Sequence, residues 1–443
     1  MEKKRFNKLT LIYYLIYNFL LWFILPFLLI YILIHTAFSP KHLKLFLQKL
    51  SLKLPFILSD RPIIWIHGVS AGEISSIKVL VDLLKDKYSL FITTSTITGM
   101  MMAKKLYQRE VLSFFPYDYP ILCRRLIKRI KPKAIFLVEL EIWPMFLKEA
   151  YRLNIPTFLI SGRIGDKEFN GYNFFKSFFK EVFNLLTVLL MQSKGDYEKM
   201  KLLGVDESKI YTSGNIKFDL PISDLEPQLN DNYSRIKNQP LDEVILIAAS
   251  THNGEESLFL KVYAKLKLKY PYLKMIIAPR HPERTNQIRK IIKSIGFTSL
   301  KWSKININNC ICGKWNEEVL LVDSIGELMF FYQLADITLI GGSFVNNIGG
   351  HNPIEPAFYS KPIIIGPSTN NFRWIVQSFL NNSALIQIKC HKSKYVDELY
   401  TTIEQLILNK SLRKDFGERA KELINMHNNV SQRVIKQIES YIN

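Results

Sequence analysis

Cysteine is scarce in this chain, and its spacing excludes two common uses of the residue. Four cysteines, Cys123, Cys310, Cys312 and Cys390, occur among 443 residues. None belongs to a paired C-x-x-C pattern, and Cys310 and Cys312 have no matching second pair. The usual zinc-site spacings and a disulfide framework are therefore excluded. We expect four reduced thiols in a cytosolic protein.

Acidic residues are also few relative to basic ones. The chain has 39 Asp and Glu against 59 Lys and Arg, which gives a formal net charge of +20. Such a balance suggests an anionic partner: nucleic acid, a membrane surface or a phosphorylated ligand. No basic motif interleaved with aromatic residues is present, and no recognition helix stands out, so nucleic acid is not an expected partner. The many Lys, Asn and Ile residues leave coding bias open as another source of the charge.

Charge of either sign is absent between Leu9 and Ile34, where large apolar residues dominate. About 20 such residues cross a bilayer, so we interpret residues 1–40 as an N-terminal membrane anchor. The apolar core is too long for a cleaved signal peptide. Pro26 lies in its middle, so the segment either spans the membrane or lies in its interface. Both flanks carry four basic residues, so the charge bias gives no orientation.

No sequence repeat is evident, but one pattern occurs twice: short apolar strands alternate with amphipathic helices. The expected strands are Ile63–His67, Leu90–Thr94, Val111–Phe115, Ala134–Leu140, Thr157–Ser161 and Val188–Gln192, then Val244–Ala249, Lys274–Ala278, Val319–Val322, Ile337–Ile340, Pro362–Ile365 and Ala384–Ile388. Expected helices include Glu73–Lys85, Gly254–Lys269, Arg284–Ile295 and Gly326–Leu334. The pattern predicts two doubly wound α/β domains, 41–220 and 221–443, joined by a polar linker at Pro221–Pro240. Ligands of such sheets bind at the carboxyl ends of the strands.

The first half contains the run Trp65-Ile66-His67-Gly68-Val69-Ser70-Ala71-Gly72-Glu73, a strand that leads through a loop into a helix. Glu73 opens that helix, and the small residues around it leave room for a substrate hydroxyl, so it could be a general base. The alternative is a first-turn glutamate that only complements the helix dipole. A helix N-terminus lowers the pKa of a carboxylate, so burial would have to raise it again for effective catalysis.

A second acidic motif, Val138-Glu139-Leu140-Glu141-Ile142-Trp143-Pro144, places two carboxylates on one side of a strand end. No histidine or further aspartate accompanies them, so we do not expect a metal site. We expect Glu139 and Glu141 to orient a sugar or a cationic side chain. A purely structural ion pair is the alternative, and Arg163 after the next strand is one possible partner.

Lys217 lies in Gly214-Asn215-Ile216-Lys217-Phe218-Asp219, where the cleft between two domains should be. A flexible ammonium group there can neutralise charge that develops on a leaving phosphate. The alternative is a solvated lysine.

The second half carries loops suited to a nucleotide. In Gly349-Gly350-His351-Asn352-Pro353-Ile354-Glu355-Pro356, the glycines allow close approach of a ligand, Asn352 can cap a helix and Pro353 suits its first turn. Glu355 could then accept two hydroxyl hydrogen bonds from a ribose. Four other loops follow predicted strands: Ala249–Glu256, Ala278–Arg284, Ser324–Leu328 and Gly341–Ser343. Arg280 in the second of them suits bidentate phosphate binding.

Together these motifs resemble the Kdo transferases, the 3-deoxy-D-manno-octulosonic acid transferases of lipopolysaccharide assembly. Seven motifs occur in order from about Arg61 to the C-terminus: HGVSAGE, ELEIWP, GNIKFD, ASTHNGEE, PRHPER, IGELMFFY and GGHNPIEP. The resemblance implies two Rossmann-like domains facing a cleft, the glycosyltransferase-B fold, with an N-terminal membrane-anchor helix. It implies transfer of Kdo from CMP-Kdo onto a lipid A precursor, lipid IVA, with inversion and without a metal or other cofactor.

The resemblance also implies roles for individual residues. Glu73 would accept the proton of the acceptor hydroxyl, while Glu141, rather than Glu139, and Lys217 would support the transition state. CMP would be held by Pro279, Arg280, Ile325, Gly326, Glu327, Asn352, Pro353, Ile354 and Glu355. Gly162, where many members have alanine, and Phe358, where a small residue is usual, depart from the family outside these motifs. The enzyme would sit at the inner membrane through its single anchor, with membrane lipids as partners and the catalytic domains on the cytoplasmic side.

Two alternatives remain open at this point. A glycosyltransferase of the same fold that uses a UDP-sugar would have a similar C-terminal site, although a diphosphate needs more hydrogen-bond donors. A membrane-anchored nucleotide-binding module without catalysis is the other alternative. The acid and base candidates in both halves argue against it.

Overall fold

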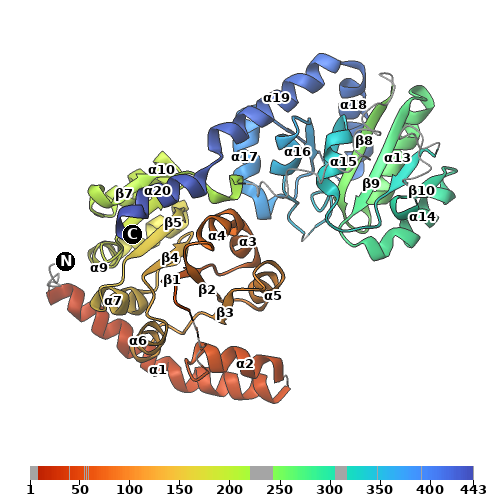
Figure 1. Ribbon diagram of the computed structural model, residues 1–443. Coiled ribbons are helices and arrows are strands. Elements are labelled where there is room, and N and C mark those ends of the chain that lie inside the picture. The colour runs from red at the N-terminus through yellow and green to blue at the C-terminus, as the bar shows by residue number, and fades with distance from the viewer. Residues whose placement is uncertain are drawn as a thin grey trace. The chain divides into compact units, whose positions relative to one another are not determined.

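A computed structural model of the chain describes residues 8–38, 40–53, 55, 57, 59–219, 243–304, 317–346, 348–390 and 392–442. The chain divides into two compact units (Figure 1). The first comprises Met1–Asp219 and Asn429–Asn443, and the second comprises Leu220–Asn428. The expected linker at Pro221–Pro240 and two of the four cysteines, Cys310 and Cys312, lie outside the described residues. Cys123 and Cys390 are free thiols.

The first unit is built on a parallel sheet of seven strands in the order β3-β2-β1-β4-β5-β6-β7. Its strands are β1 (Ile63–His67), β2 (Ser89–Thr94), β3 (Val111–Phe114), β4 (Ala134–Val138), β5 (Thr157–Gly162), β6 (Val188–Met191) and β7 (Ile210–Thr212). Its helices are α1 (Lys8–Phe38), α2 (Pro40–Lys49), α3 (Ala71–Ser76), α4 (Lys78–Leu84), α5 (Ile97–Leu106), α6 (Pro120–Ile130), α7 (Pro144–Arg152), α8 (Asp166–Phe174), α9 (Lys176–Phe183), α10 (Lys194–Leu202) and α20 (Val430–Ile442).

Apolar residues cover both faces of this sheet, as a doubly wound arrangement requires. Along β1, Trp65 packs in one buried cluster with α6 and α7, while Ile64 and Ile66 pack in another with α4 and α20. Alternate residues of a strand point to opposite faces, so the continuous apolar run seen in the sequence forms two cores.

The second unit repeats the plan with a parallel sheet in the order β10-β11-β9-β8-β12-β13-β14. Its strands are β8 (Val244–Thr251), β9 (Leu273–Pro279), β10 (Ser299–Lys301), β11 (Val319–Leu321), β12 (Ile337–Ile340), β13 (Ile363–Ile365) and β14 (Ile386–Gln387). Its helices are α13 (Glu255–Lys269), α14 (Thr285–Ser294), α15 (Leu328–Leu334), α16 (Ile354–Phe358), α17 (Arg373–Asn381), α18 (Tyr395–Leu408) and α19 (Lys410–His427). The prediction of two doubly wound α/β sheets is confirmed.

The C-terminal end of the chain differs from the expected division at residue 220. The last helix, α20, belongs to the first unit, although one domain is predicted for all of 221–443. Val430, Val434 and Ile438 of α20 are buried in a core cluster of the first unit. The Asp219 carboxylate accepts a hydrogen bond of 2.8 Å from the Val430 backbone N–H and so holds the start of α20.

Three local features differ from the predicted elements. The expected helix Glu73–Lys85 is divided at Ile77 into α3 and α4. Two three-residue strands, β7 and β10, were not predicted; β10 lies at a sheet edge and neither presents a long apolar run.

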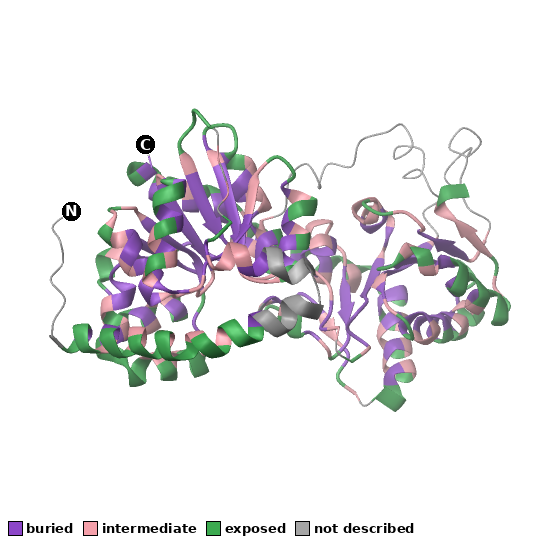
Figure 2. Cartoon of the chain, turned by 90° about the horizontal axis from the view of Figure 1, so that it is seen from below, coloured by how far each residue is buried: buried purple, intermediate pink, exposed green. Residues whose placement is uncertain are grey.

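Helix α1 is long and apolar enough, from Leu9 to Ile32, to cross a membrane, with a mean hydropathy of 2.3. Most of its surface is exposed (Figure 2). It is therefore compatible with the expected membrane anchor.

Candidate active site

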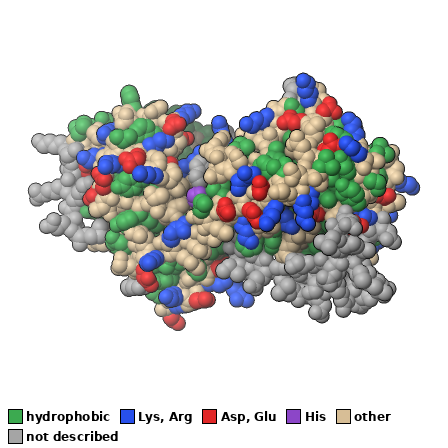
Figure 3. Space-filling view, turned by 90° about the horizontal axis from the view of Figure 1, so that it is seen from above, with side chains coloured by type: hydrophobic (Ala, Val, Ile, Leu, Met, Phe, Trp, Pro, Cys, Tyr) green, Lys and Arg blue, Asp and Glu red, His purple; other side chains and the backbone are tan. Residues whose placement is uncertain are grey.

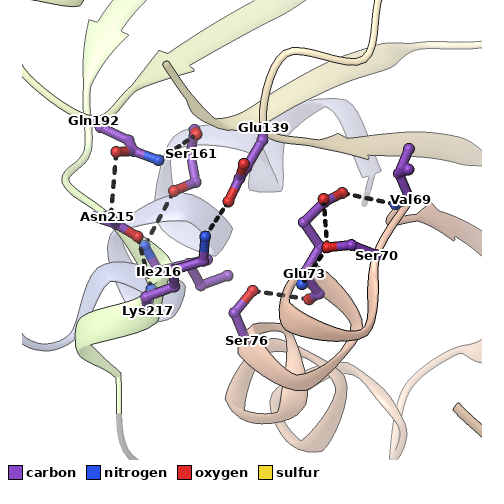
Figure 4. A network of polar contacts seen from close by, with 10 residues as sticks. All are labelled: Val69, Ser70, Glu73, Ser76, Glu139, Ser161, Gln192, Asn215, Ile216 and Lys217. Carbon is purple, nitrogen blue, oxygen red and sulfur yellow. Dashed lines mark hydrogen bonds and ion pairs between the residues drawn. The ribbon is translucent and has the colours of Figure 1, made fainter. Parts of the chain in front are cut away.

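In the first unit, strands β1 and β4 lie side by side at the centre of the sheet, and their connections run to opposite sides. This is the position at which an open parallel sheet binds ligands. Glu73 follows β1, and Glu139 and Glu141 follow β4. Lys217 lies in the 3-10 turn η2 (Ile216–Phe218) after β7. Figure 4 shows Glu73, Glu139 and Lys217 gathered in one polar network.

Glu73 stands in the first turn of α3, which begins after Ser70. The Ser70 hydroxyl accepts a hydrogen bond from the Glu73 backbone N–H, as an N-cap residue does. The same hydroxyl donates to Glu73 Oε1 at 2.8 Å, and the Val69 backbone N–H donates to Oε2 at 2.6 Å. These bonds fix the orientation of the carboxylate.

Burial decides the acidity of Glu73. The residue is 8% exposed. Loss of hydration raises the pKa of its carboxyl above the ordinary value, and the nearby Glu139 charge adds to the rise. The hydrogen bonds from Ser70 and Val69 and the charge of Lys217 oppose the rise without reversing it. The sequence predicted two opposing effects on the pKa of Glu73, from the helix terminus and from burial. Burial has the larger effect.

Glu139 and Lys217 form an ion pair, and the Lys217 ammonium donates to Glu139 Oε1. Both side chains are about a quarter to a third exposed, at 28% and 29%. The backbone of Glu139 has a φ of 60°, a left-handed conformation that non-glycine residues seldom adopt. Backbone strain of this kind concentrates at functional sites. The ion pair suggested from the sequence therefore exists, but its basic partner is Lys217, while Arg163 is exposed.

The turn that carries Lys217 is held by a set of hydrogen bonds that the sequence motifs did not reveal. Asn215 accepts from the Lys217 backbone N–H at 2.9 Å and donates to Gln192 at 3.2 Å. Gln192 donates to the Ser161 carbonyl at 3.0 Å, and the Ser161 hydroxyl accepts from the Ile216 N–H at 3.2 Å. Ser161 also has a positive φ, of 55°. The network ties the ends of β5 and β6 to the lysine.

Glu141 is a half-buried carboxylate with a strongly raised pKa. Burial, followed by the negative charges of Glu73 and Glu139, raises its pKa to about 7. The indole N–H of Trp143 donates to Glu141 at 3.1 Å and partly offsets the rise. Three carboxylates near one lysine thus share a small volume, and this arrangement favours proton transfer near neutral pH.

In the second unit, the carboxyl ends of β8, β9 and β12 bring together histidines and an arginine. The His252 and His351 rings are stacked with centroids 5.1 Å apart, and one Nε2–H donates to the other Nε2 across 2.8 Å. His281 lies beside His252 at 5.9 Å between ring centroids. Burial, followed by the charges of Arg280, His252 and His281, lowers the pKa of His351 to about 4. The cluster of histidines was not identified from the sequence, because its members are far apart along the chain.

Two acidic residues of the Ala249–Glu256 loop, Glu255 and Glu256, hold neighbouring parts of the second unit together. Glu255 is 1% exposed and accepts three backbone hydrogen bonds, from His252 at 2.8 Å, Gly342 at 2.7 Å and Phe344 at 2.9 Å. The backbone N–H of Gly342, in one of the loops expected to suit a nucleotide, therefore already donates to Glu255. Glu256 is also buried and forms a bidentate pair with Arg284.

The remaining predicted nucleotide ligands lie on neighbouring loops of the same unit. Arg280 is exposed directly after Pro279, the last residue of β9. Helix α16 begins at Ile354, and the Asn352 side chain accepts from the Ile354 N–H at 3.1 Å. Asn352 also donates to Glu355 at 3.4 Å.

Glycine is required in two of these loops. Gly349 and Gly350 have φ values of 86° and 77°, and Gly326 has 99°. A side chain would be strained at each position. Ile325 is 79% exposed beside Gly326, and Glu327 is the N-cap residue of α15.

Among the described residues, no group of three or more His, Cys, Asp or Glu side chains could hold a metal ion.

Comparisons with known proteins give these features a context. Residues 45–220 match the model of a family described as 3-Deoxy-D-manno-octulosonic-acid transferase (kdotransferase). The 3-deoxy-D-manno-octulosonic acid transferase of Haemophilus influenzae is 31% identical over 86% of this chain and 87% of its own length. The protein of the same name from Rickettsia felis is 30% identical over 88% and 82%. The UDP-GlcNAc 2-epimerase of Neisseria meningitidis shares the fold, with a TM-score of 0.55 at 11% identity over 86% of this chain and all of that one.

Proposed function

Because the chain belongs to the family of 3-deoxy-D-manno-octulosonic acid (Kdo) transferases, which are glycosyltransferases of the B fold, we propose that it transfers Kdo from CMP-Kdo to lipid IVA. Lipid IVA is the lipid A precursor of lipopolysaccharide. The observation that supports catalysis most strongly is the buried Glu73 carboxylate beside the Glu139–Lys217 pair.

Glu73 is the proton acceptor in this proposal. The acceptor hydroxyl oxygen attacks the anomeric carbon of Kdo, and the bond from that carbon to the CMP phosphate oxygen breaks with inversion. The hydroxyl proton moves to Glu73. Its raised pKa makes Glu73 a stronger base than an exposed glutamate, and the bonds from Ser70 and Val69 hold it in place.

Lys217 and Glu141 support the transition state. Negative charge grows on the phosphate of CMP as it leaves, and the Lys217 ammonium can stabilise it electrostatically. Glu139 holds that ammonium group. Glu141, with a pKa of about 7, can be neutral near physiological pH and then does not repel the carboxylate of Kdo.

The loops of the second unit are the proposed donor site. Pro279, Arg280, Ile325 to Glu327 and Asn352 to Glu355 would hold CMP. The donor carries a single phosphate, so Arg280 and Lys217 can replace a metal ion in balancing its charge. We propose transfer without a metal or other cofactor, at the cytoplasmic face of the inner membrane, where α1 holds the enzyme near its lipid acceptor.

A direct assay tests the proposal. Full-length protein in detergent, with EDTA, is given CMP-Kdo and tetraacylated lipid IVA, and products are weighed by mass spectrometry. We expect a gain of one or more Kdo units. Retained CMP binding without product, or turnover of a UDP-sugar in place of CMP-Kdo, would contradict the proposed donor or acceptor.

A further inference from the structure

Helix α1 is in contact with the rest of the first unit from Thr10 to Ile32. Its buried and half-buried side chains form one stripe at helical spacing: Thr10, Tyr13, Tyr14, Tyr17, Asn18, Leu21, Leu25, Leu28 and Ile32. Residues three and four apart share one face of a helix, so this stripe is a single continuous contact surface. The remaining surface of the helix is apolar and exposed, for example at Leu15, Phe19, Phe23 and Phe27, which are 62–69% exposed.

Specific contacts hold this stripe at both ends and in the middle. Near the N-terminus of α1, Tyr14 packs edge-on against Phe178 of α9, with ring centroids 5.1 Å apart. In the middle, the Tyr119 hydroxyl donates to the Leu21 carbonyl at 2.6 Å. Near the other end, Ile32 is buried with Phe46 and Met100. Figure 1 shows α1 running past α9, α7 and α6 towards α2.

The most specific of these contacts involves a buried acid. The Tyr17 hydroxyl donates to Asp118 at 2.9 Å. The same carboxylate accepts the backbone N–H groups of Met145 and Phe146, at 3.0 and 2.7 Å, at the start of α7. Detaching α1 would break this bond and uncover an apolar surface of the globular unit.

The docked arrangement is incompatible with a helix that crosses the bilayer. The elements beside α1 carry charged groups: the Lys148 ammonium of α7 lies 4.1 Å from the centroid of the Tyr14 ring, and Arg124 of α6 is paired with Glu149. If α1 crossed the hydrocarbon core, these groups would enter it, and charged side chains there are strongly unfavourable.

We propose that α1 is an in-plane anchor, docked lengthwise on the first unit with its outward face among the acyl chains of one leaflet. An ordinary interfacial helix has a polar face of its own. This helix has none, because the globular unit to which it is bound supplies the polar side. The occupant of the exposed apolar face is therefore a lipid bilayer, and the chain's net charge of +20 favours an anionic lipid surface.

The position of α1 has a consequence that rests on the proposed function. Asp118 and Tyr119 follow β3, so they lie at the carboxyl ends of the strands, as do Glu73 and Glu139, which follow β1 and β4. An in-plane α1 would hold these strand ends at the membrane surface, where the sugar hydroxyl of a lipid-linked acceptor is exposed.

Depth measurements distinguish an in-plane helix from a crossing one. In the full chain with its cysteines replaced by serine, single cysteines at Leu15, Phe19, Phe23 and Phe27 are spin-labelled in vesicles of phosphatidylethanolamine and phosphatidylglycerol. Accessibility to oxygen and to a nickel chelate then reports the depth of each label. Leu268→Cys, at a position 87% exposed in the second unit, is the aqueous reference.

An in-plane helix predicts similar depths, within about 5 Å, at all four positions. A crossing helix predicts a change of about 18 Å between Leu15 and Phe27, from the rise of 1.5 Å per residue, and that result would overturn the proposal. Aqueous accessibility at all four positions would overturn it as well, since the face would then not contact lipid.

A second readout uses the natural residues of the helix. A tag before residue 8 is exposed to protease in inside-out membrane vesicles if α1 lies in the plane, because both ends are then on the side of the catalytic units. Protection of the tag in these vesicles, with cleavage in the opposite orientation, would show crossing. Neither readout requires CMP-Kdo, so failure of the anchor proposal is separate from failure of the proposed function.

Discussion

The two units place a glutamate at the same position and use it differently. In each, the first strand of the sheet leads into a helix whose first turn carries a buried glutamate: Glu73 after β1 and Glu255 after β8. Among the described residues, the Glu73 carboxylate accepts hydrogen bonds only from Val69 and Ser70, which directly precede its own helix. Glu255 joins its own turn to the loop after β12 through Gly342 and Phe344. A buried first-turn glutamate is thus not evidence of catalysis until its partners are known.

The charged groups around the two glutamates differ in the same way. Glu73 faces Glu139, Glu141 and Lys217, a set that perturbs protonation near neutral pH. The corresponding strand ends of the second unit present three imidazoles and Arg280, and the guanidinium of Arg280 suits an anionic ligand. On the face shown in Figure 3, basic and acidic side chains are interspersed. Under the proposed function, one fold carries a proton-transfer site in one unit and an anion-binding site in the other.

The largest effect on stability is expected from Glu255→Ala. Three buried backbone N–H groups lose their acceptor, and each unsatisfied group costs about 1–3 kcal/mol, so the second unit should lose roughly 3 kcal/mol or more. Calorimetry should show a lowered Tm for that unit. Glu422→Ala, at an exposed position of α19, is the control. An unchanged Tm in Glu255→Ala would remove the distinction between the two glutamates.

Lys217→Met tests the electrostatic role in the first unit. Loss of a group that stabilises developing charge typically reduces kcat by about 10²–10³. Lys201→Met, at a partly exposed position of α10, should leave kcat unchanged. Steady-state rates with CMP-Kdo measure both. A reduction of less than about fivefold in Lys217→Met would mean that Lys217 only balances Glu139.

Glu141→Gln should stabilise the protein in a pH-dependent manner. The folded pKa of about 7 lies above the ordinary 4.5, so the folded state binds this proton more tightly, and the glutamate lowers stability as pH rises from 4.5 through 7. The variant should gain on the order of 1–3 kcal/mol at pH 8.5 and almost nothing at pH 4.5. Unfolding curves at the two pH values measure this, with the exposed Glu168→Gln as control. An equal gain in the free energy of unfolding at both pH values would exclude titration of Glu141 as the cause.

Ser70→Ala should have the smallest effect on stability and a diagnostic effect on rate. Loss of the N-cap costs about 1 kcal/mol. The hydrogen bond from Ser70 lowers the pKa of Glu73, so its removal should move the acidic limb of the pH–rate profile to higher pH. Ser70→Thr, which keeps a hydroxyl, should restore the limb. If the acidic limb of the pH–rate profile does not move in Ser70→Ala, another group is the base.

Much of the fold follows from local patterns. The strands Ile63–His67 and Ile337–Ile340 lie where they were predicted, and β2 agrees within one residue, because continuous apolar runs identify buried parallel strands. The return of α20 to the first unit could not be predicted, since an apolar stripe in the sequence does not specify which core the helix packs against.

The site was predictable as a set of loops but not as a set of contacts. The family resemblance indicated that Glu73, Glu141 and Lys217 act together, but not that Glu139 is the residue paired with Lys217. The Glu139–Lys217 pair joins residues 78 positions apart, and the His252–His351 pair joins residues 99 apart. Such partners are chosen by the strand order of the sheet, which no local pattern encodes.

The measurement that tests the central claim most directly compares Glu73→Gln with the wild type in the same samples, for Kdo transfer and for CMP binding. The substitution keeps the size of the side chain and removes its basicity. We predict that turnover falls by about 10²–10⁴ while the Kd for CMP and the Tm stay nearly unchanged. Turnover within a few-fold of the wild type would contradict the assignment of Glu73 as the proton acceptor, as would a loss of CMP binding or stability that accounts for the lost activity.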